Sequence, residues 1–250
     1  MAGVALVTGA GDRLGKAMAL ALGANGYDVA IHYHRSEQKA EDVAATINAS
    51  GAKAVTLQAD LSAEANTEAL IAKTQKALGP VNLLVNSASV FENDGIDNMT
   101  RESWDTHIET NLRTPLKLSQ EFAKQAVGNN NSIINIVDQR VWKLTPQFLS
   151  YTLSKAGLLH LTKTLAQSLG PQGIRVNAIG PGPTLRNARQ SEDDWRKQNE
   201  ATILGYGATP DDIVGALLYL VGAKAVTGQM IAVDGGQHLT WQTPDVMINE

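Results

Sequence analysis

Short apolar runs alternate with longer amphipathic stretches from one end of the chain to the other. Most of the short runs are continuous in Val, Ile and Leu, which is typical of strands covered on both faces. We expect strands at Val4–Thr8, Asp28–Tyr33, Ala54–Gln58, Leu83–Asn86, Ser132–Val137, Arg175–Ile179 and Met230–Val233. Helical patterns between them cover Gly15–Asn25, Glu37–Ser50, Glu64–Leu78, Arg101–Val127, Phe148–Leu169 and Pro210–Val221. This alternation predicts a seven-stranded parallel sheet with helices on both faces.

The chain shows no internal repeat, low-complexity tract or linker, and its 250 residues suit one doubly wound unit. We therefore predict the α/β fold class, with a single Rossmann-type domain over residues 1–250. Residues 180–207 interrupt the rhythm with Gly-Pro-Gly-Pro and a charged stretch. Two interpretations are open for this segment: a lid over a substrate, or a solvated loop with a short helix.

Charge and composition exclude several classes of function. The formal net charge of -4 provides no basic face for nucleic acid or a membrane surface. The absence of cysteine excludes disulfides, thiolate metal sites and cysteine nucleophiles. The chain opens on an apolar strand without a charged n-region, and no apolar run approaches the ~20 residues of a membrane helix. We expect a cytoplasmic protein whose ligands are small molecules.

The first strand runs into the string TGAGDRLG, which is followed by a helix. Glycine at such a turn lets the backbone approach a pyrophosphate, and the helix N-terminus offers N–H groups and a positive dipole end. The string resembles the Thr-Gly-x-x-x-Gly-x-Gly loop of the short-chain dehydrogenase/reductase family, and the resemblance covers essentially the whole chain. It implies cofactor contacts at Gly9, Arg13 and Leu14.

Arg13 departs from that pattern, which has glycine at its position. Two interpretations are open: a tolerated surface arginine, or a guanidinium that binds a cofactor phosphate or an electron-rich substrate. We favour the second, because a glycine in a demanding backbone conformation is seldom replaced without gain. The Arg-Leu-Gly ending is similar to that of the pteridine reductases within the family.

The end of the second expected strand indicates the cofactor. NAD-preferring Rossmann enzymes usually carry a carboxylate there, whereas this chain has donors at His34, Arg35 and Ser36 that suit a 2′-phosphate. His32 and His34 share a strand face, which also suits a metal pair, but there is no obvious third ligand and we expect no metal. The string HYHRS resembles the pteridine reductases and implies NADP(H). The resemblance also implies cofactor contacts at Asp60 and Leu61.

Tyr151 and Lys155 stand four residues apart, so both project from one face of a helix. A phenol with a pKa of ~10 is a poor proton carrier at neutral pH unless a cation favours the phenolate, and Lys155 is such a cation. In the family resemblance, Asp138 takes the position of a catalytic serine. Asn111 matches the fourth catalytic member, which is linked to a proton-relay water.

An aspartate at position 138 changes the expected chemistry. A carboxylate near Tyr151 disfavours the phenolate, and its own pKa rises in turn. That suits proton donation to a ring nitrogen during reduction of a C=N bond, and pteridine and dihydromonapterin/dihydrofolate reductases carry aspartate there. A second interpretation is that Asp138 only caps a loop.

The segment NSASVF follows the fourth expected strand. The resemblance implies that its first part, Asn86, Ser87 and Ala88, passes over the nicotinamide ribose, and that Ser89 and Phe91 contact a pterin. Ser87 and Val90 depart from the family pattern here, and Phe91 also suits ordinary core packing. Further along, NAIGPGPT resembles the loop that holds the cofactor carboxamide. In that loop the backbone of Ile179 and the side chain of Thr184 would make the contacts.

These observations leave three hypotheses for function. The first is NADPH-dependent reduction of a pterin, dihydropterin or dihydrofolate, with Arg13, Ser89, Phe91, Asp138 and Tyr151 at the substrate. The second is a carbonyl or 3-oxoacyl reductase that acts on a C=O group, and the third is a non-catalytic NADP(H) sensor. The family resemblance implies a homotetramer, for which we expect an apolar helix face at Leu158, Leu159, Leu161 and Leu165.

Overall fold

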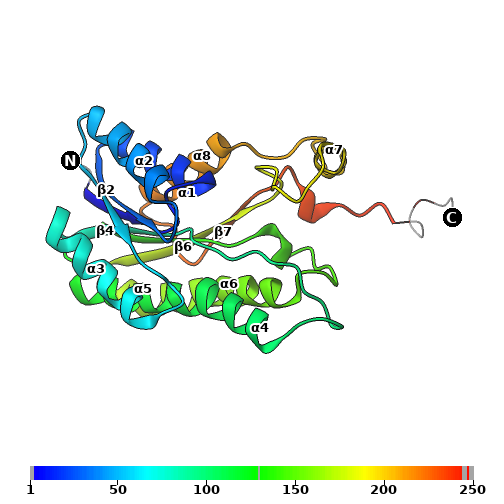
Figure 1. The fold of residues 1–250 in the computed structure, drawn as a ribbon, viewed down its shortest axis with the longest axis horizontal. Coiled ribbons are helices and arrows are strands. Elements are labelled where there is room, and N and C mark those ends of the chain that lie inside the picture. The colour runs from blue at the N-terminus through cyan, green and yellow to red at the C-terminus, as the bar shows by residue number, and fades with distance from the viewer. Residues whose placement is uncertain (1–2, 129, 244–246, 248–250) are drawn as a thin grey trace.

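The computed structural model describes residues 3–128, 130–243 and 247, which form a parallel sheet between two layers of helices (Figure 1). The sheet has seven strands in the order β3-β2-β1-β4-β5-β6-β7, all parallel. The strands are β1 (Gly3–Val7), β2 (Tyr27–Tyr33), β3 (Ala54–Gln58), β4 (Val81–Asn86), β5 (Asn131–Ile136), β6 (Ile174–Pro181) and β7 (Met230–Val233). The expected fold class and strands are confirmed, with every strand end within two residues of its expected place.

Each face of the sheet carries its own helices (Figure 1). One layer holds α1 (Arg13–Ala24), α2 (Glu37–Ala49) and α8 (Pro210–Gly222). The other holds α3 (Glu64–Leu78), α4 (Arg101–Ile108), α5 (Thr114–Gln125) and α6 (Leu149–Leu169). None of the helices that the structure describes is both long and apolar enough to span a membrane.

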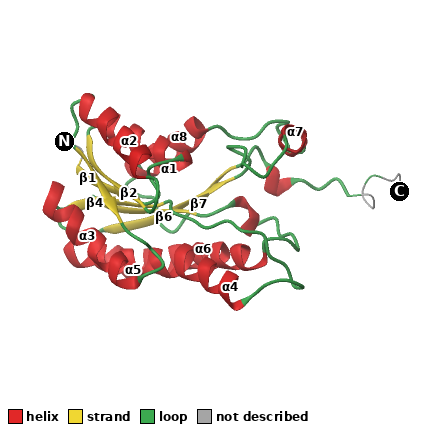
Figure 2. Cartoon of the chain, in the orientation of Figure 1, coloured by secondary structure: helices red, strands yellow, loops and turns green. Residues whose placement is uncertain are grey.

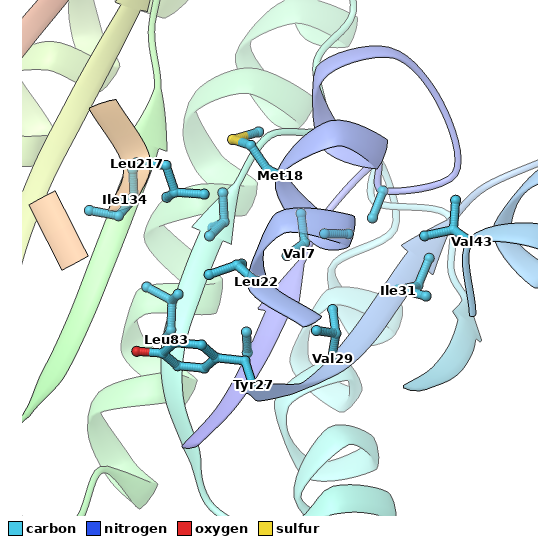
Figure 3. Packing of buried hydrophobic residues seen from close by; sticks show 14 of the residues in the cluster. Val7, Met18, Leu22, Tyr27, Val29, Ile31, Val43, Leu83, Ile134 and Leu217 are labelled. Carbon is cyan, nitrogen blue, oxygen red and sulfur yellow. The ribbon is translucent and has the colours of Figure 1, made fainter. Parts of the chain in front are cut away.

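Among the described residues the core forms three apolar clusters, and the two larger ones lie on opposite sides of the sheet. On one side, Val7, Ile31 and Leu83 pack with Leu22 of α1 and Leu217 of α8 (Figure 3). The neighbouring strand residues, among them Leu6, Leu84 and Ile133, point to the opposite side and pack with Phe122 of α5. Because both strand faces are buried, the strands are continuous apolar runs rather than alternating ones.

One expectation about helices is wrong. The expected helix Arg101–Val127 is interrupted by a π-helical turn at Glu109–Arg113, which separates α4 from α5. The 180–207 segment contains a short helix, α7 (Glu192–Glu200), as one of its two interpretations expected; its first turn is acidic and none of its residues is buried.

The leucines proposed as a subunit interface are not available for one. Leu158, Leu159 and Leu165 are buried within the chain, and Leu161 is partly buried against the same clusters. Their apolar character is explained by the packing of α6 on the sheet. The homotetramer stays a prediction, and its subunit interface would have to lie on a different face of the chain.

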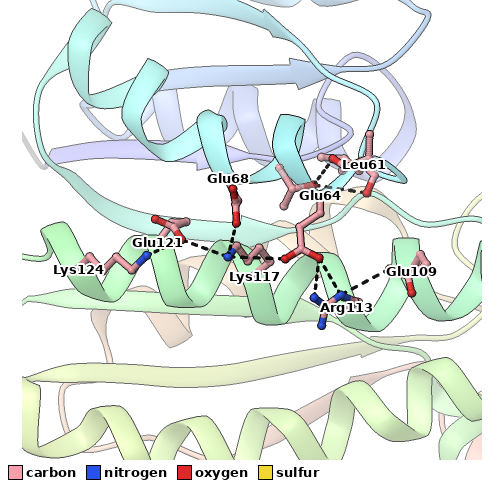
Figure 4. A network of polar contacts seen from close by, with 10 residues as sticks. Leu61, Glu64, Glu68, Glu109, Arg113, Lys117, Glu121 and Lys124 are labelled. Atoms are coloured by element: carbon pink, nitrogen blue, oxygen red, sulfur yellow. Dashed lines mark hydrogen bonds and ion pairs between the residues drawn. The ribbon is translucent and has the colours of Figure 1, made fainter.

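Charged side chains join the outer surfaces of α3 and α5 (Figure 4). Arg113 contacts Glu64 at 2.5 Å, and Lys117 contacts Glu68 at 2.5 Å. These side chains are partly exposed, so each pair adds little stability alone. Arg113 is the last residue of the π-helical turn, and its ion pair joins that turn to Glu64 at the start of α3.

The strand order reverses between β1 and β4, which is where ligands bind in open α/β sheets, at the carboxyl ends of the strands. Figure 2 shows that loops and α7 gather at the end of the molecule opposite the N-terminus. A cleft of about 1000 Å³ opens at that end.

Candidate active site

Asp138 and Tyr151 meet at the floor of this cleft. Asp138 follows β5 and begins a short 3-10 turn (Gln139–Val141), where its Oδ1 accepts a hydrogen bond from the Arg140 N–H at 2.8 Å. Tyr151 lies in the first turn of α6, and its hydroxyl donates to Oδ2 of Asp138 at 2.8 Å. Asp138 and Tyr151, which stand thirteen positions apart in the sequence, are thus directly hydrogen-bonded.

Burial raises the pKa values of both members of this pair. Burial raises the pKa of the Asp138 carboxyl above its usual value, although the hydrogen bonds from Arg140 and Tyr151 act against that shift. Burial, together with the charge of Asp138, raises the pKa of Tyr151 well above 10. Tyr151 is therefore a neutral phenol at neutral pH, and Asp138 holds a proton more readily than an exposed aspartate.

Lys155 lies one helical turn beyond Tyr151 and is also buried. Its Nζ donates to the carbonyl oxygen of Ile136 at 2.8 Å and lies 5.8 Å from the centre of the Tyr151 ring. Burial lowers the pKa of Lys155 to about 8, which the nearby Asp138 partly opposes. The lysine is thus mostly charged at pH 7, next to the phenol but not hydrogen-bonded to its hydroxyl.

Asn111 sits in the π-helical turn and ties two elements of the site together. Its amide group donates to the Val90 carbonyl at 2.9 Å and to the Ser154 hydroxyl at 3.1 Å. Its Oδ1 accepts from the Val90 N–H at 2.9 Å and from the Ser89 hydroxyl at 3.1 Å. A π-helical turn commonly marks a functional position. Here it brings the asparagine between the loop after β4 and helix α6.

The glycine turn after β1 is closely packed. Gly9 has a φ of 65°, and a Cβ on it would lie 3.0 Å from the Cα of Ala88. A Cβ on Gly15 would overlap the carbonyl group of Gly9. Both positions therefore require glycine, and the turn presents bare backbone to the cleft as a pyrophosphate site needs.

Arg13 begins α1 with a φ of 50°, a backbone conformation that disfavours side chains. Its guanidinium donates to the carbonyl of Leu185 at 2.9 Å and to that of Arg186 at 3.1 Å. Both carbonyls belong to the 180–207 segment, so Arg13 connects the glycine turn to that segment. Its contact with a phosphate or substrate stays a prediction.

A buried histidine lies near the end of β2, and three exposed hydrogen-bond donors follow the strand. His32 is buried, its Nδ1 accepts from the Gly9 N–H at 3.0 Å, and its Nε2 lies 3.1 Å from the Ala59 carbonyl. Burial lowers the pKa of His32 to about 4, so the ring is neutral and both nitrogens serve the backbone. His34, Arg35 and Ser36, which follow it along the cleft lining, are exposed.

An aromatic pair stands beside Tyr151. The Phe91 ring lies 4.7 Å from the Tyr151 ring, edge to face, and stacks on the Phe148 ring at 4.4 Å with an interplanar angle of 4°. Sequence reasoning found Phe91 but missed Phe148, which precedes α6 with a φ of 58°. A left-handed phenylalanine has no recognisable sequence signal.

Most of the predicted site residues line one cleft. Those that do are Gly9, Arg13, Leu14, His34, Arg35, Ser36, Asp60, Leu61, Ser87, Ala88, Ser89, Phe91, Asp138, Tyr151, Lys155 and Thr184. Asn86, Asn111 and Ile179 lie behind the wall and are fully or almost fully buried. The Asn86 amide donates to Asn135 at 2.8 Å, and the Ile179 carbonyl accepts from the Val137 N–H at 2.8 Å, so these two groups brace the strands.

The 180–207 segment forms one side of the cleft, to which it contributes Pro181, Gly182, Pro183, Thr184, Leu185, Asn187, Arg189, Gln190, Trp195 and Gln198. Arg189 donates to the carbonyl of Phe91 at 2.7 Å and pairs with Glu92, which fastens the segment to the loop after β4. The segment is thus positioned over the cleft, and its opening and closing stay a prediction.

Similarity to known proteins extends over nearly the full chain. A family model described as enoyl-(acyl carrier protein) reductase matches residues 9–238. The 3-oxoacyl-(acyl-carrier-protein) reductase FabG of Staphylococcus epidermidis is 33% identical over 240 residues, which are 94% of this chain and 98% of the relative.

Two solved structures are similar in both sequence and fold. The FolM alternative dihydrofolate reductase 1 of Brucella canis, complexed with NADP, is 43% identical with a TM-score of 0.93 over 97% of this chain and 96% of that chain. Its counterpart from Brucella suis, also with NADP, is 44% identical with a TM-score of 0.92 over 96% of this chain and 97% of that chain.

Proposed function

Because this chain belongs to the short-chain dehydrogenase/reductase family, we propose that it is an NADPH-dependent reductase of a pterin, dihydropterin or dihydrofolate. The observation that carries the proposal is the 2.8 Å hydrogen bond between Tyr151 and Asp138, two groups whose pKa values are both raised. A pair that holds its protons more readily than exposed groups do suits donation to a ring nitrogen. The 43–44% identity to proteins described as alternative dihydrofolate reductases supports the same substrate class.

The residues around the cleft fit NADP(H). The closely packed Gly9 and Gly15 leave room for a pyrophosphate at the start of α1, and Arg35 and Ser36 provide donors for a 2′-phosphate. Asp60 also lines the cleft, where its carboxylate would accept a hydrogen bond from the adenine amino group. When bound, NADPH supplies the hydride for the reduction. The two FolM structures contain NADP, which supports this cofactor choice.

The protein's own part in the reaction is to deliver a proton. Reduction of a C=N bond places a hydride on carbon and a proton on nitrogen, while the electron pair of the broken π bond forms the N–H bond. The proton is delivered through the hydrogen-bonded pair of Asp138 and Tyr151, in which the Tyr151 hydroxyl donates to Oδ2 of Asp138. Lys155 keeps a positive charge beside the pair, and Asn111 positions the loop that carries Ser89 and Phe91.

A carbonyl or 3-oxoacyl reductase is the second candidate, because FabG enzymes are 33% identical over almost the whole chain. That activity shares the fold, the cofactor and Tyr151 with the first candidate. It gives no role to Asp138, Arg13 or the stacked Phe91. A non-catalytic sensor is disfavoured by the presence of Asn111, Tyr151 and Lys155 together.

A scan of substrates for NADPH oxidation separates the candidates. The purified protein is offered dihydropterins, dihydrofolate, activated ketones and a 3-oxoacyl thioester under the same conditions. We expect turnover of the dihydropterins or dihydrofolate to exceed that of every carbonyl compound. Faster turnover of a ketone or 3-oxoacyl thioester would favour the second candidate, and no turnover with measurable NADPH binding would favour the sensor.

A further inference from the structure

Arg140 is a cation in the cleft, close enough to Asp138 for its charge to lower the pKa of that carboxyl. It lies two residues after Asp138, lines the cleft and is partly buried. Its Nη1 donates to the Thr145 hydroxyl at 2.7 Å, and its Nε is buried without any hydrogen-bond partner. Within the described residues, the Arg140 guanidinium forms no ion pair.

Another arginine without an ion pair shows the usual compensation. The half-buried Arg175 donates to the carbonyls of Leu220, Val221 and Ala223, so its guanidinium is well satisfied. A charged group withdrawn from water is normally paired or fully hydrogen-bonded, because desolvation without compensation is costly. Arg140 therefore has binding capacity that the chain itself does not use.

Arg140 lies against an aromatic pair. Its guanidinium stands 4.9 Å over the Phe148 ring, Phe148 stacks on Phe91, and Arg189 stands 5.9 Å over the Phe91 ring. The two arginines thus flank an aromatic pair. Phe148 is held there at a φ of 58°, a left-handed conformation that is strained for a non-glycine residue. Such strain clusters at functional sites, where the arrangement that it produces is needed.

We propose that the outer part of the cleft at Arg140 is a carboxylate subsite, so that the enzyme prefers substrates whose planar ring carries an acidic tail. The inference rests on the proposed function and narrows its substrate class to dihydrofolate, whose glutamyl tail has carboxylates, over dihydropterins with a neutral side chain. Arg140 pairs with a tail carboxylate, while the ring lies near Phe91 and the Asp138–Tyr151 pair.

The test compares two substrates in two variants. For Arg140→Gln we expect kcat/KM on dihydrofolate to fall by about tenfold or more, mainly through KM, since a charge-assisted contact is lost. For dihydrobiopterin, which has no carboxylate, we expect a change of less than about twofold. Arg196→Gln is the matched control, because Arg196 lies on α7 outside the cleft lining and pairs with Asp193 and Glu200. It should leave both substrates unchanged.

A binding measurement keeps this inference separate from the proposed function. Calorimetry with p-aminobenzoylglutamate, in the presence of NADP⁺, should detect binding to the wild type and a loss of about tenfold or more in Arg140→Gln. This holds even if no pterin proves to be a substrate. Equal losses on both substrates, with a shifted pH profile, would mean that Arg140 acts on Asp138 and would overturn the carboxylate subsite. Absence of p-aminobenzoylglutamate binding to the wild type would overturn it as well.

Discussion

Tyr151→Phe removes one hydroxyl from the centre of the site and little else. Tyr151 is 5% exposed, and its ring lies 4.7 Å from Phe91 and 6.0 Å from His107. Phenylalanine retains those ring contacts, so we expect the variant to fold and to bind NADPH. The hydrogen bond to Asp138 at 2.8 Å is lost, which costs about 1–3 kcal/mol of stability because a buried polar partner is left unpaired.

The effect on catalysis should be larger than the effect on stability. Loss of a positioned proton-transfer group typically lowers the rate by about 10²–10⁴-fold, and a hundredfold loss corresponds to about 2.7 kcal/mol of barrier. The assay is the steady-state turnover of a dihydropterin at saturating NADPH, with NADPH affinity measured separately. Tyr219→Phe is the control, since Tyr219 is exposed on α8 and lies outside the cleft lining.

The residual activity of Tyr151→Phe has a second readout. The Tyr151 hydrogen bond lowers the pKa of Asp138, so its removal should raise that pKa further. A proton donor works below its pKa, and the pH at which the rate falls should therefore move upward. Retention of most of the wild-type turnover would refute the reasoning, because the proton would then reach the substrate without Tyr151.

Two further predictions concern the cofactor end of the cleft. Arg35→Ala should weaken NADPH binding by roughly 1.5–3 kcal/mol, the size of a charge-assisted contact, while NADH affinity stays nearly unchanged by calorimetry; equal losses for both cofactors would exclude Arg35 from the 2′-phosphate. Gly15→Ala places a Cβ against the Gly9 carbonyl and should destabilise the protein by about 1–3 kcal/mol in urea unfolding. Gly215→Ala on α8, where a Cβ meets nothing within 4 Å, should be neutral or stabilising by up to about 1 kcal/mol, and a similar loss in both variants would contradict the packing argument.

The sequence predicted the sheet well because its strands are buried on both faces. Ala54–Gln58 and Met230–Val233 lie where they were expected, since each is a short β-rich run bounded by turn residues. The helix Glu64–Leu78 likewise has its expected ends. The π-helical turn at Glu109–Arg113 was missed because the helical pattern continues through it, and the extra residue of a π turn leaves no mark on composition.

The sequence predicted many of the residues that line the site, but not the contacts between distant segments that hold them in place. The string TGAGDRLG predicted Arg13 as a site residue, and the spacing of Tyr151 and Lys155 together with the family resemblance predicted Tyr151; both line the cleft. Contacts between distant segments were not visible in the sequence. The donation from Arg13 to the 180–207 segment and the left-handed Phe148 are set by tertiary packing, which local patterns do not encode.

The central claim is that Asp138 serves a ring nitrogen, and Asp138→Ser tests it most directly. Serine can polarise a carbonyl oxygen, but it is a far weaker acid than a carboxyl group whose pKa is raised by burial. The measurement is the ratio of turnover on a dihydropterin to turnover on an activated ketone, in the wild type and in the variant. We predict that the ratio falls by roughly tenfold or more, which equals ~1.4 kcal/mol of differential barrier. Loss of both activities in equal proportion would contradict the claim and would identify the protein as a carbonyl reductase with an unusual aspartate.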